Sequence, residues 1–397
     1  MVENKDKKVL NVPNLRFPEF EGEWEKCTIG KQFELYSGNT PSRINKELFN
    51  GTINWISSGE LKEHYIYSTK ERISQEAANN LKLLSVGTFV IAIYGLEAEG
   101  VRGTGSITQE PSTISQACMA FTPKGEITNE FLYSWYKKHG HVIGVKYAQG
   151  TKQQNLSYDI LEKFKISYPN VKEQDKLNLF FSLIDKRIST QNKIIEDLKK
   201  LKSAIIEIEY SSKTKTSSHI GDFIVQTSKR NKDNAIQTVL SVSNRQGFIQ
   251  QSEQFENRCV ASDDTSNYKI VERNDFAFNP ARINVGSIAR LITFEKGIVS
   301  PMYICFRTKD YATPEYLDYF FESKLFFTEI QKRLEGSVRQ CLSYESLCNI
   351  PFPLLAIEVQ QRIGKQLFTL AQKIKLETDF LEILHKQKQH LLRQMFI

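Results

Sequence analysis

Apolar residues recur at alternating spacings of four and three between Val171 and Tyr210. This spacing keeps one face of an α-helix apolar, so it predicts a long helix whose seam packs against another helix. Two polar residues interrupt the seam, which runs Leu177, Phe181, Ile184, Ile188, Gln191, Ile195, Leu198, Lys202 and Ile205. Asn170 is the predicted N-cap of this helix, with Glu173 placed to complete a capping box.

The same pattern returns 186 residues later, from Ile357 to the end of the sequence. Its polar interruptions also match, because Glu377 occupies the position equivalent to Gln191 and Lys388 the position equivalent to Lys202. One such run alone would equally suit a helix buried in an ordinary globular core. Polar groups at a seam cost stability and fix register or partner choice, so two matched runs favour helices that pack on each other.

The stretches ahead of the two helices repeat as well. Short apolar runs broken by Gly and Pro predict strands, and a helix is expected from Asn129 to about Lys138, so each stretch is predicted to be an α+β domain. Matching landmarks include 29–30 with 220–221, 115–121 with 300–306, and 156–158 with 342–344. The loop 94–103 has no obvious counterpart within 279–286, which indicates one scaffold carrying different loops.

The predicted order is therefore domain, helix, domain, helix. The boundaries are a first domain at 1–169, a first spacer helix at 170–212, a second domain at 213–355 and a second spacer helix at 356–397. The polar stretch 211–218 has almost nothing to bury and is predicted to be a linker. Folding of the first domain is expected to begin near Leu15.

Composition indicates the redox state of the cysteines and the cellular compartment, but it does not determine the function. Lys and Arg number 53 against 46 Asp and Glu, a net charge of +7 that suits a polyanionic partner but is common in other proteins. The six cysteines form no CxxC pair, which is typical of reduced core thiols. No apolar run is long enough to span a bilayer, and no signal core precedes the first domain, so we expect a cytoplasmic protein.

Residue patterns of catalysis are absent from the sequence. There is no GxxxxGK[ST] phosphate loop, HExxH, GxSxG or strand-to-helix GxGxxG. Asn279-Pro280 lacks the second proline and the aromatic residue of an adenine methyltransferase motif. His139 and His141 have no neighbouring carboxylate or cysteine cluster, so they are expected at an exposed helix end rather than at a metal. The sequence thus predicts a chain without catalytic residues, bound metal or cofactor.

Polar loops are the remaining candidates for function. The segments 150–155 and 336–340 precede a helix at corresponding positions, and each is rich in groups that can address base edges or phosphates. Either loop alone is as well explained by a polar surface, but their matched placement favours DNA binding. The candidate DNA-binding residues are Arg43, Lys46, Arg102, Thr151, Lys152, Gln153, Gln154 and Asn155, then Lys229, Arg230, Asn244, Arg245, Asn279, Arg282, Ser337, Arg339 and Gln340. Lys62, Arg72, Arg258 and Arg290 are further candidates for phosphate contacts.

The arrangement resembles the specificity subunits of type I restriction-modification systems. The likeness rests on the opening segment 15–18 with Trp24, the runs 276–288 and 300–303, and the paired helices. It implies two target recognition domains, each reading one half of an interrupted DNA sequence, separated by two antiparallel helices. It also implies partners: methyltransferase subunits, expected to be two, which use S-adenosylmethionine, and motor-nuclease subunits, which use ATP and Mg. Base contacts do not transfer, because the recognition loops of this family vary with the target.

Two other classes of protein remain open at this stage. A stand-alone DNA methyltransferase or nuclease would carry a cryptic active site and turn over by itself. A coiled-coil scaffold that binds protein and ignores DNA would show no steep loss of affinity with salt, unlike a protein that contacts phosphates.

Overall fold

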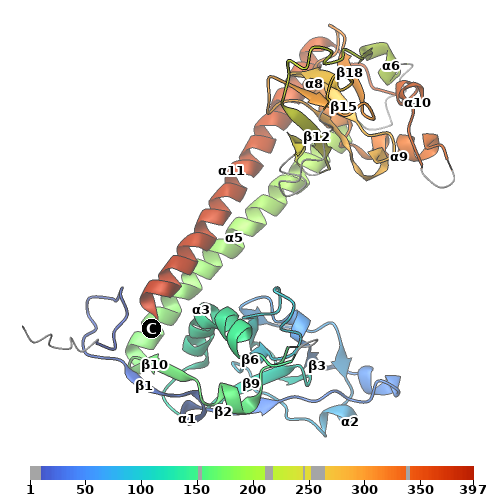
Figure 1. Ribbon diagram of the computed structural model, residues 1–397. Helices are drawn as coiled ribbons and strands as arrows, with labels where there is room; N and C mark the ends of the chain where they lie inside the picture. The colour runs from blue at the N-terminus through green and yellow to red at the C-terminus, as the bar shows by residue number, and fades with distance from the viewer. Residues whose placement is uncertain (1–9, 151–153, 211–217, 245, 252–263, 337–339) are drawn as a thin grey trace, which may run out of the picture. The chain divides into compact units, whose positions relative to one another are not determined.

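The computed structural model describes residues 10–150, 154–210, 218–244, 246–251, 264–336 and 340–397 (Figure 1). It divides into two compact units. Unit 1 is Met1–Gln191 with Phe380–Ile397, and unit 2 is Asn192–Asp379. The long helices α5 (Val171–Glu209) and α11 (Ile357–Met395), each of 39 residues, therefore contribute to both units. The four boundaries expected from the sequence remain a prediction, and the linker lies almost wholly outside the described residues.

Unit 1 is built on a five-stranded sheet with one helix across it. The strand order is β2 (Phe33–Ser37), β9 (Cys118–Pro123), β6 (Phe89–Ala92), β7 (Gly105–Thr108) and β4 (Tyr65–Ile66). Helix α3 (Asn129–Tyr147) starts at the Thr128 cap, whose hydroxyl accepts from the Phe131 amide at 3.2 Å. The rings of Tyr133 and Tyr136 on α3 lie 5.9 and 5.8 Å from the Phe89 ring of β6, which places the core between helix and sheet.

Helix α3 is nine residues longer than the sequence predicted. It runs through Gly140, where an added Cβ would lie 2.9 Å from the Cα of Gly103, so glycine permits close packing of the loop on the helix. The expectation of an exposed helix end at His139 is wrong. Its ring is half-buried, lies 4.7 Å from the Trp135 ring, and places Nε2 3.0 Å from the Ile397 carbonyl oxygen.

A smaller sheet and a strand pair complete unit 1. The small sheet has the order β5 (Arg72–Ile73), β3 (Ile53–Ile56) and β8 (Ser112–Ile114), with β3 parallel to β8. Strands β1 (Glu25–Thr28) and β10 (Lys165–Tyr168) pair antiparallel beside α1 (Ile29–Gln32). The chain is ordered before Leu15, because the Asn11 carbonyl accepts from the Trp24 amide at 2.8 Å.

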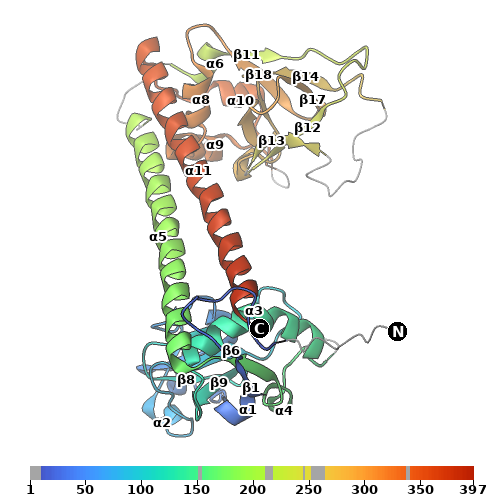
Figure 2. The same ribbon diagram turned by 90° about the vertical axis from the view of Figure 1, so that its left-hand side faces the viewer.

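Unit 2 repeats this topology (Figure 2). Its first sheet has the order β11 (Ile224–Thr227), β18 (Ile304–Thr308), β15 (Phe276–Phe278) and β16 (Ile288–Arg290), the same as β2, β9, β6 and β7. Its second sheet has the order β13 (Gly247–Gln250), β12 (Val239–Ser243), β17 (Lys296–Val299) and β14 (Lys269–Glu272). Strands β12 and β17 are parallel, like β3 and β8. The helical layer is α8 (Pro314–Phe320) followed by α9 (Lys324–Arg333).

The long helices run antiparallel within each unit. In unit 1 the Phe181 ring of α5 lies 5.6 Å from the ring of Phe396, the residue after α11, and Asp185 pairs with Lys388. In unit 2 the Glu209 carboxylate lies 3.6 Å from the Arg362 guanidinium. All the predicted seam positions of both helices are buried or half-buried. These contacts confirm the predicted fold class of paired helices with two similar α+β parts.

A buried glutamine at the start of each long helix repeats with the same hydrogen bonds. Gln174 Oε1 accepts from the Thr128 amide at 3.0 Å, and its Nε2 donates to the Pro169 carbonyl at 2.9 Å. Gln360 Oε1 accepts from the Thr313 amide at 3.0 Å, and its Nε2 donates to the Leu355 carbonyl at 2.9 Å. Each glutamine thus fixes a long helix to the cap of the helix that covers the sheet.

Capping of α5 confirms one half of the predicted box. Asn170 Oδ1 accepts from the Glu173 amide at 3.1 Å. The Glu173 carboxylate instead binds Arg16, with Oε2 2.7 Å from Nη2 and Oε1 2.8 Å from Nε, and accepts from Trp24 Nε1 at 3.3 Å. Across the ranges that the structure covers, no helix is both long and apolar enough to cross a bilayer.

Candidate nucleic-acid interface

Two hairpin loops at equivalent positions are closed by the same backbone bonds. Gln149 and Asn155 exchange two hydrogen bonds of 2.8 and 2.9 Å, and Glu335 and Cys341 exchange two of 3.0 and 2.8 Å. Gly150 (φ 115°) and Gly336 (φ 104°) begin the loops in a backbone conformation that favours glycine. The matched placement predicted from the sequence is therefore confirmed. The tips, with Thr151, Lys152, Gln153, Ser337 and Arg339, lie outside the described residues.

A second loop packs beside each hairpin. The Leu156 amide donates to the Ile93 carbonyl at 2.9 Å in unit 1, and the Leu342 amide donates to the Pro280 carbonyl at 3.1 Å in unit 2. Segment 94–103 therefore does have a positional counterpart at 279–286, contrary to the sequence comparison. Both segments follow equivalent strands, β6 and β15, but differ in length and residues.

Arg102 joins the two loops of unit 1. Its Nε donates to the Leu96 carbonyl at 2.5 Å, and its Nη2 approaches the Glu97 carbonyl at 3.3 Å and Gln154 Oε1 at 3.5 Å. The Gln154 carbonyl accepts from the Leu96 amide at 3.0 Å, and the Gln154 amide donates to the Glu97 carboxylate at 2.9 Å. Arg102 therefore holds the two loops together, and its role as a DNA contact stays a prediction. Gln154 and Asn155 are half-buried at the base of the hairpin.

Asn279 in unit 2 has a similar structural role. It is 7% exposed, and its Oδ1 accepts from the Ala281 amide at 3.1 Å. Little of the Asn279 carboxamide is exposed, and its assignment as a DNA-binding residue stays a prediction. Arg282, Asn244 and Gln340 are exposed, as DNA contacts would require. Arg245 and Arg258 lie outside the described residues.

Two other candidate arginines are engaged with carboxylates. Arg290 is 6% exposed, places Nε 3.2 Å from Asp318 Oδ2 and also pairs with Glu315, so its assignment to a phosphate-binding face is wrong. Arg43 is exposed, but its Nη1 donates to Glu71 Oε1 at 2.5 Å and its Nη2 donates to Glu71 Oε2 at 2.9 Å. Its guanidinium carbon also lies 4.2 Å from the centre of the Phe49 ring. Lys46, by contrast, is exposed at the start of the neighbouring 3₁₀ turn.

A basic cleft of about 670 Å³ lies in unit 2. Lys229 and Arg230, both expected from the sequence, line it together with Lys232, Lys296 and a single carboxylate, Asp233. Arg230 Nη1 donates to Asn267 Oδ1 at 2.8 Å, which orients its guanidinium. Four cations around one hollow suit the phosphates of a nucleic-acid backbone. Lys232 and Lys296 were not anticipated, since the fold alone brings β17 beside the segment after β11.

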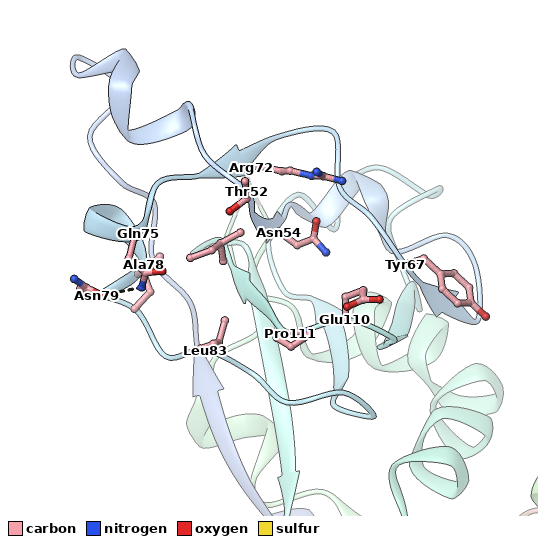
Figure 3. Close-up of a pocket in the computed structure, with 12 residues that line it drawn as sticks. Thr52, Asn54, Tyr67, Arg72, Gln75, Ala78, Asn79, Leu83, Glu110 and Pro111 are labelled. Atoms are coloured by element: carbon pink, nitrogen blue, oxygen red, sulfur yellow. Dashed lines mark hydrogen bonds between the residues drawn. The ribbon is translucent and has the colours of Figure 1, made fainter.

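A cleft of about 730 Å³ in unit 1 has a different lining (Figure 3). Asn54, Gln75 and Asn79 face it along with Arg72 and Glu110. Asn54 is 8% exposed and accepts from the Thr69 hydroxyl at 3.3 Å, and Gln75 Nε2 donates to Asn79 Oδ1 at 3.0 Å. Sequence patterns indicated Arg72 alone, because β3, β5 and α2 (Gln75–Ala78) are too short to show a period.

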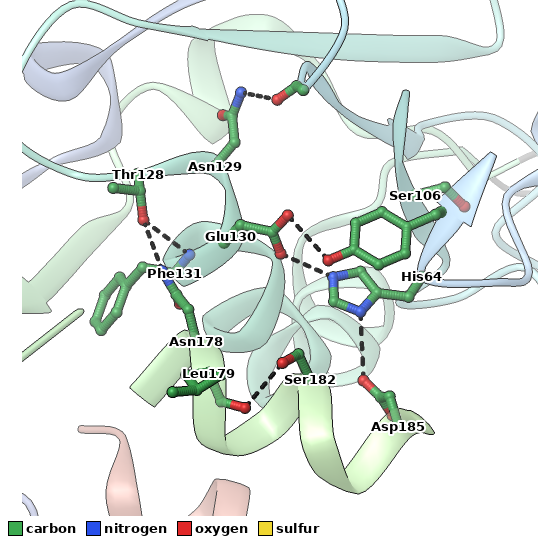
Figure 4. Close-up of polar contacts among 12 residues, drawn as sticks. His64, Ser106, Thr128, Asn129, Glu130, Phe131, Asn178, Leu179, Ser182 and Asp185 are labelled. Atoms are coloured by element: carbon green, nitrogen blue, oxygen red, sulfur yellow. Dashed lines mark hydrogen bonds and ion pairs between the residues drawn. The ribbon is translucent and has the colours of Figure 1, made fainter. Parts of the chain in front are cut away.

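A polar cluster in unit 1 joins His64, just before β4, to Glu130 of α3 and Asp185 of α5 (Figure 4). The His64 ring stacks between Tyr65 and Tyr133, with centroid separations of 4.0 and 3.9 Å. Its Nε2 lies 2.9 Å from Glu130 Oε2 and its Nδ1 3.4 Å from Asp185 Oδ2. Asp185 also pairs with Lys388. Among the residues that can be placed, no group of three or more His, Cys, Asp or Glu side chains has the grouping of a metal site.

Comparison with known sequences finds relatives of the first half of the chain. Residues 21–200 match the type I restriction modification DNA specificity domain. Over 189 residues the chain is 30% identical to the EcoR124I/EcoR124II specificity subunit of Escherichia coli, covering 46% of this chain and 45% of that protein. Over 185 residues it is 28% identical to the MjaIX specificity subunit of Methanocaldococcus jannaschii, covering 45% and 42%. The matches thus span less than half the length of these relatives.

Comparison with solved structures extends the likeness of fold to nearly the whole chain. The S subunit of the type I restriction-modification system of M. genitalium superposes with a TM-score of 0.61 at 16% identity, covering 97% of this chain and 99% of that one. A chain from a study of assembly and conformational transition of the type I R-M system gives 0.56 at 13% identity, covering 94% and 97%. Residues 21–200 therefore resemble the type I restriction modification DNA specificity domain in sequence, and the chain shares the fold of the M. genitalium S subunit.

Proposed function

We propose that this chain is the DNA-recognition subunit of a type I restriction-modification complex and carries no catalytic activity of its own. Unit 1 and unit 2 each bind one half of an interrupted target in double-stranded DNA. The observation that carries this proposal is that the loops 149–155 and 335–341 are closed by the same pair of backbone hydrogen bonds but differ in sequence. Two loops that are closed alike but differ in sequence suit two recognition domains that bind two different half-sites.

Protein partners are supported by a second apolar stripe on α5. In unit 2, Ile194, Leu201 and Ile208 are between 40% and 74% exposed. At about 100° per residue they lie within roughly 60° of one another, to one side of the seam toward α11. Aligned apolar residues left in water are typical of a surface that another helix covers. We assign this stripe to methyltransferase subunits, two by expectation, with motor-nuclease subunits joining the same complex.

The chemistry belongs to those partners in this proposal. S-adenosylmethionine, ATP and Mg are expected on the methyltransferase and motor-nuclease subunits, and no cofactor is assigned to this chain. The role also places the protein in the cytoplasm with its DNA. The alternatives are a coiled-coil scaffold indifferent to DNA and a stand-alone methyltransferase or nuclease.

Methylation and binding assays separate the three functions. The purified chain should neither methylate nor cut DNA, and adding the methyltransferase with S-adenosylmethionine should produce adenine methylation at one interrupted motif. Binding of the chain to DNA should weaken with salt, with a slope in log K against log salt of about −0.9 for each phosphate contacted. Turnover by the chain alone would establish a stand-alone enzyme, and the absence of salt-dependent DNA binding would establish a scaffold.

A further inference from the structure

Two amide side chains form a pair on the wall of the unit 1 cleft. Gln75 is the first residue of α2 and Asn79 follows its last residue, which brings the carboxamides together through the 3.0 Å bond from Gln75 Nε2 to Asn79 Oδ1. Both side chains are exposed. Within the part of the chain that the structure describes, Gln75 Oε1 and Asn79 Nδ2 have no protein hydrogen-bond partner. The pair therefore presents one free acceptor and one free donor to the cleft.

This combination is complementary to a single base in the major groove. Adenine presents the N6 amino donor and the N7 acceptor there, which an acceptor and a donor can bind together. Guanine presents two acceptors, one of which would face the Gln75 oxygen. Cytosine presents only a donor, and thymine presents an acceptor and a methyl group. The amide pair thus favours adenine over the three other bases.

The rest of the lining suits base edges better than a phosphate. Asn54 on β3 adds a third carboxamide to the lining, with its Oδ1 3.3 Å from the Thr69 hydroxyl. Arg72 on β5 is exposed, as guanine or backbone contacts require. Glu110 brings a carboxylate that would repel a phosphate but can accept from the cytosine amino group. This mixture contrasts with the four cations and one carboxylate of the unit 2 cleft.

We propose that this cleft is where unit 1 reads base edges of its half-site, and that Gln75 and Asn79 together select an A·T pair. The inference rests on the proposed function, since it takes double-stranded DNA as the ligand. Beyond that function, it names the residues that distinguish between base pairs and the base pair that they prefer.

The test uses a matched pair of substitutions in the full chain. Asn79→Asp keeps the shape of the side chain but replaces its donor by an acceptor, so adenine N7 would face a carboxylate. Asn80→Asp makes the same charge change at the next residue, which is exposed but does not line the cleft. Wild type and both variants are equilibrated with a randomised duplex library at low salt, and the bound DNA is sequenced. Tryptophan fluorescence confirms that each variant is folded.

The expected result is loss of discrimination at one A·T position of one half-site in Asn79→Asp, by about fivefold to 150-fold. Asn80→Asp should keep the wild-type preference at that position, and Gln75→Ala should lose it. Unchanged discrimination in Asn79→Asp, or an equal loss in Asn80→Asp, would overturn the assignment of the cleft while leaving the proposed function intact. A wild-type chain that enriches no sequence would instead overturn the proposed function itself.

Discussion

Replacing His64 by glutamine should destabilise unit 1 at pH 6 more than at pH 8. The imidazole is 12% exposed and lies between two tyrosine rings, with one carboxylate facing each ring nitrogen. Glutamine can occupy a similar volume, but it cannot carry a positive charge or reach both Glu130 and Asp185. The substitution therefore removes the charge from the cluster and leaves both carboxylates in place.

The sign of the pH effect follows from the pKa of His64. Burial by itself lowers this pKa, but the facing Asp185 and Glu130 carboxylates outweigh burial and hold the pKa above its ordinary value of 6.5. A folded-state pKa above the unfolded value means that protonation stabilises the fold. The contribution is complete below about pH 6.5 and disappears as the pH rises through the folded-state pKa.

The size of the effect can be bounded from the contacts. A hydrogen bond between charged groups contributes about 1.5–3 kcal/mol, and the 2.9 Å contact with Glu130 meets the distance for one. The 3.4 Å contact with Asp185 is long and adds less, particularly because Lys388 already pairs with that carboxylate. We expect His64→Gln to cost about 2–3 kcal/mol at pH 6 and less than about 1 kcal/mol at pH 8. One proton limits the slope to about 1.4 kcal/mol per pH unit.

Tryptophan fluorescence can isolate unit 1 in this measurement. The three tryptophans of the chain, Trp24, Trp55 and Trp135, are all buried and all belong to unit 1. Urea unfolding followed by this signal therefore gives the stability of unit 1 at each pH. Lys137, whose pKa burial lowers to about 8 with help from the Lys388 charge, also titrates, but with the opposite sign. Its effect is present in both proteins, so the difference between them reports on His64.

The control for this experiment is His141→Gln, because His141 is exposed on α3, the helix that carries Glu130. It should follow the wild-type profile at both values of pH. If wild type and His64→Gln lost equal stability between pH 6 and pH 8, a protonated His64 would not hold the cluster together, and the reasoning from its two carboxylate contacts would be refuted.

Two further predictions follow from the repeated scaffold and the basic cleft. Gln174→Leu and Gln360→Leu should each destabilise their own unit by about 2–4 kcal/mol, because each leaves a buried backbone amide and backbone carbonyls without a partner. Only Gln174→Leu should shift the tryptophan unfolding curve, since the tryptophans belong to unit 1. Lys232→Ala and Lys296→Ala should each reduce the salt slope of DNA binding by about 1, whereas Lys365→Ala, an exposed change on α11, should not alter it.

The elements that the sequence predicted well are those with long local patterns. Nine seam positions in each of α5 and α11 define one helix face. Their spacing along the chain is enough to predict that this face is buried, without knowledge of what it packs against. The Asn170 cap is equally local, because its partner is three residues away. The half-repeat was detectable for a similar reason, since matching landmarks need only be compared with one another.

The interface residues were harder to predict because their partners are distant in sequence. Arg290 and Arg282 look alike as exposed basic candidates, yet Arg290 is buried against Asp318 and Glu315 while Arg282 faces solvent. Arg102 binds carbonyls of its own loop, which no composition or period signals. The end of α3 was misjudged because glycine lowers helix propensity, whereas tertiary packing on Gly103 favours glycine at that position.

The two units keep their scaffold by the same contacts and differ where the clefts lie. Gln174 and Gln360 repeat both a donor and an acceptor bond, so the junction of cap and long helix is built alike in both units. The cleft of unit 1 combines amides with one arginine and one carboxylate, while that of unit 2 gathers Lys229, Arg230 and two further lysines. A frame fixed by buried polar bonds can tolerate such changes, because the charged side chains of both clefts are exposed and exposed substitutions change stability little. The same frame can then present different chemistry to each half of a DNA target.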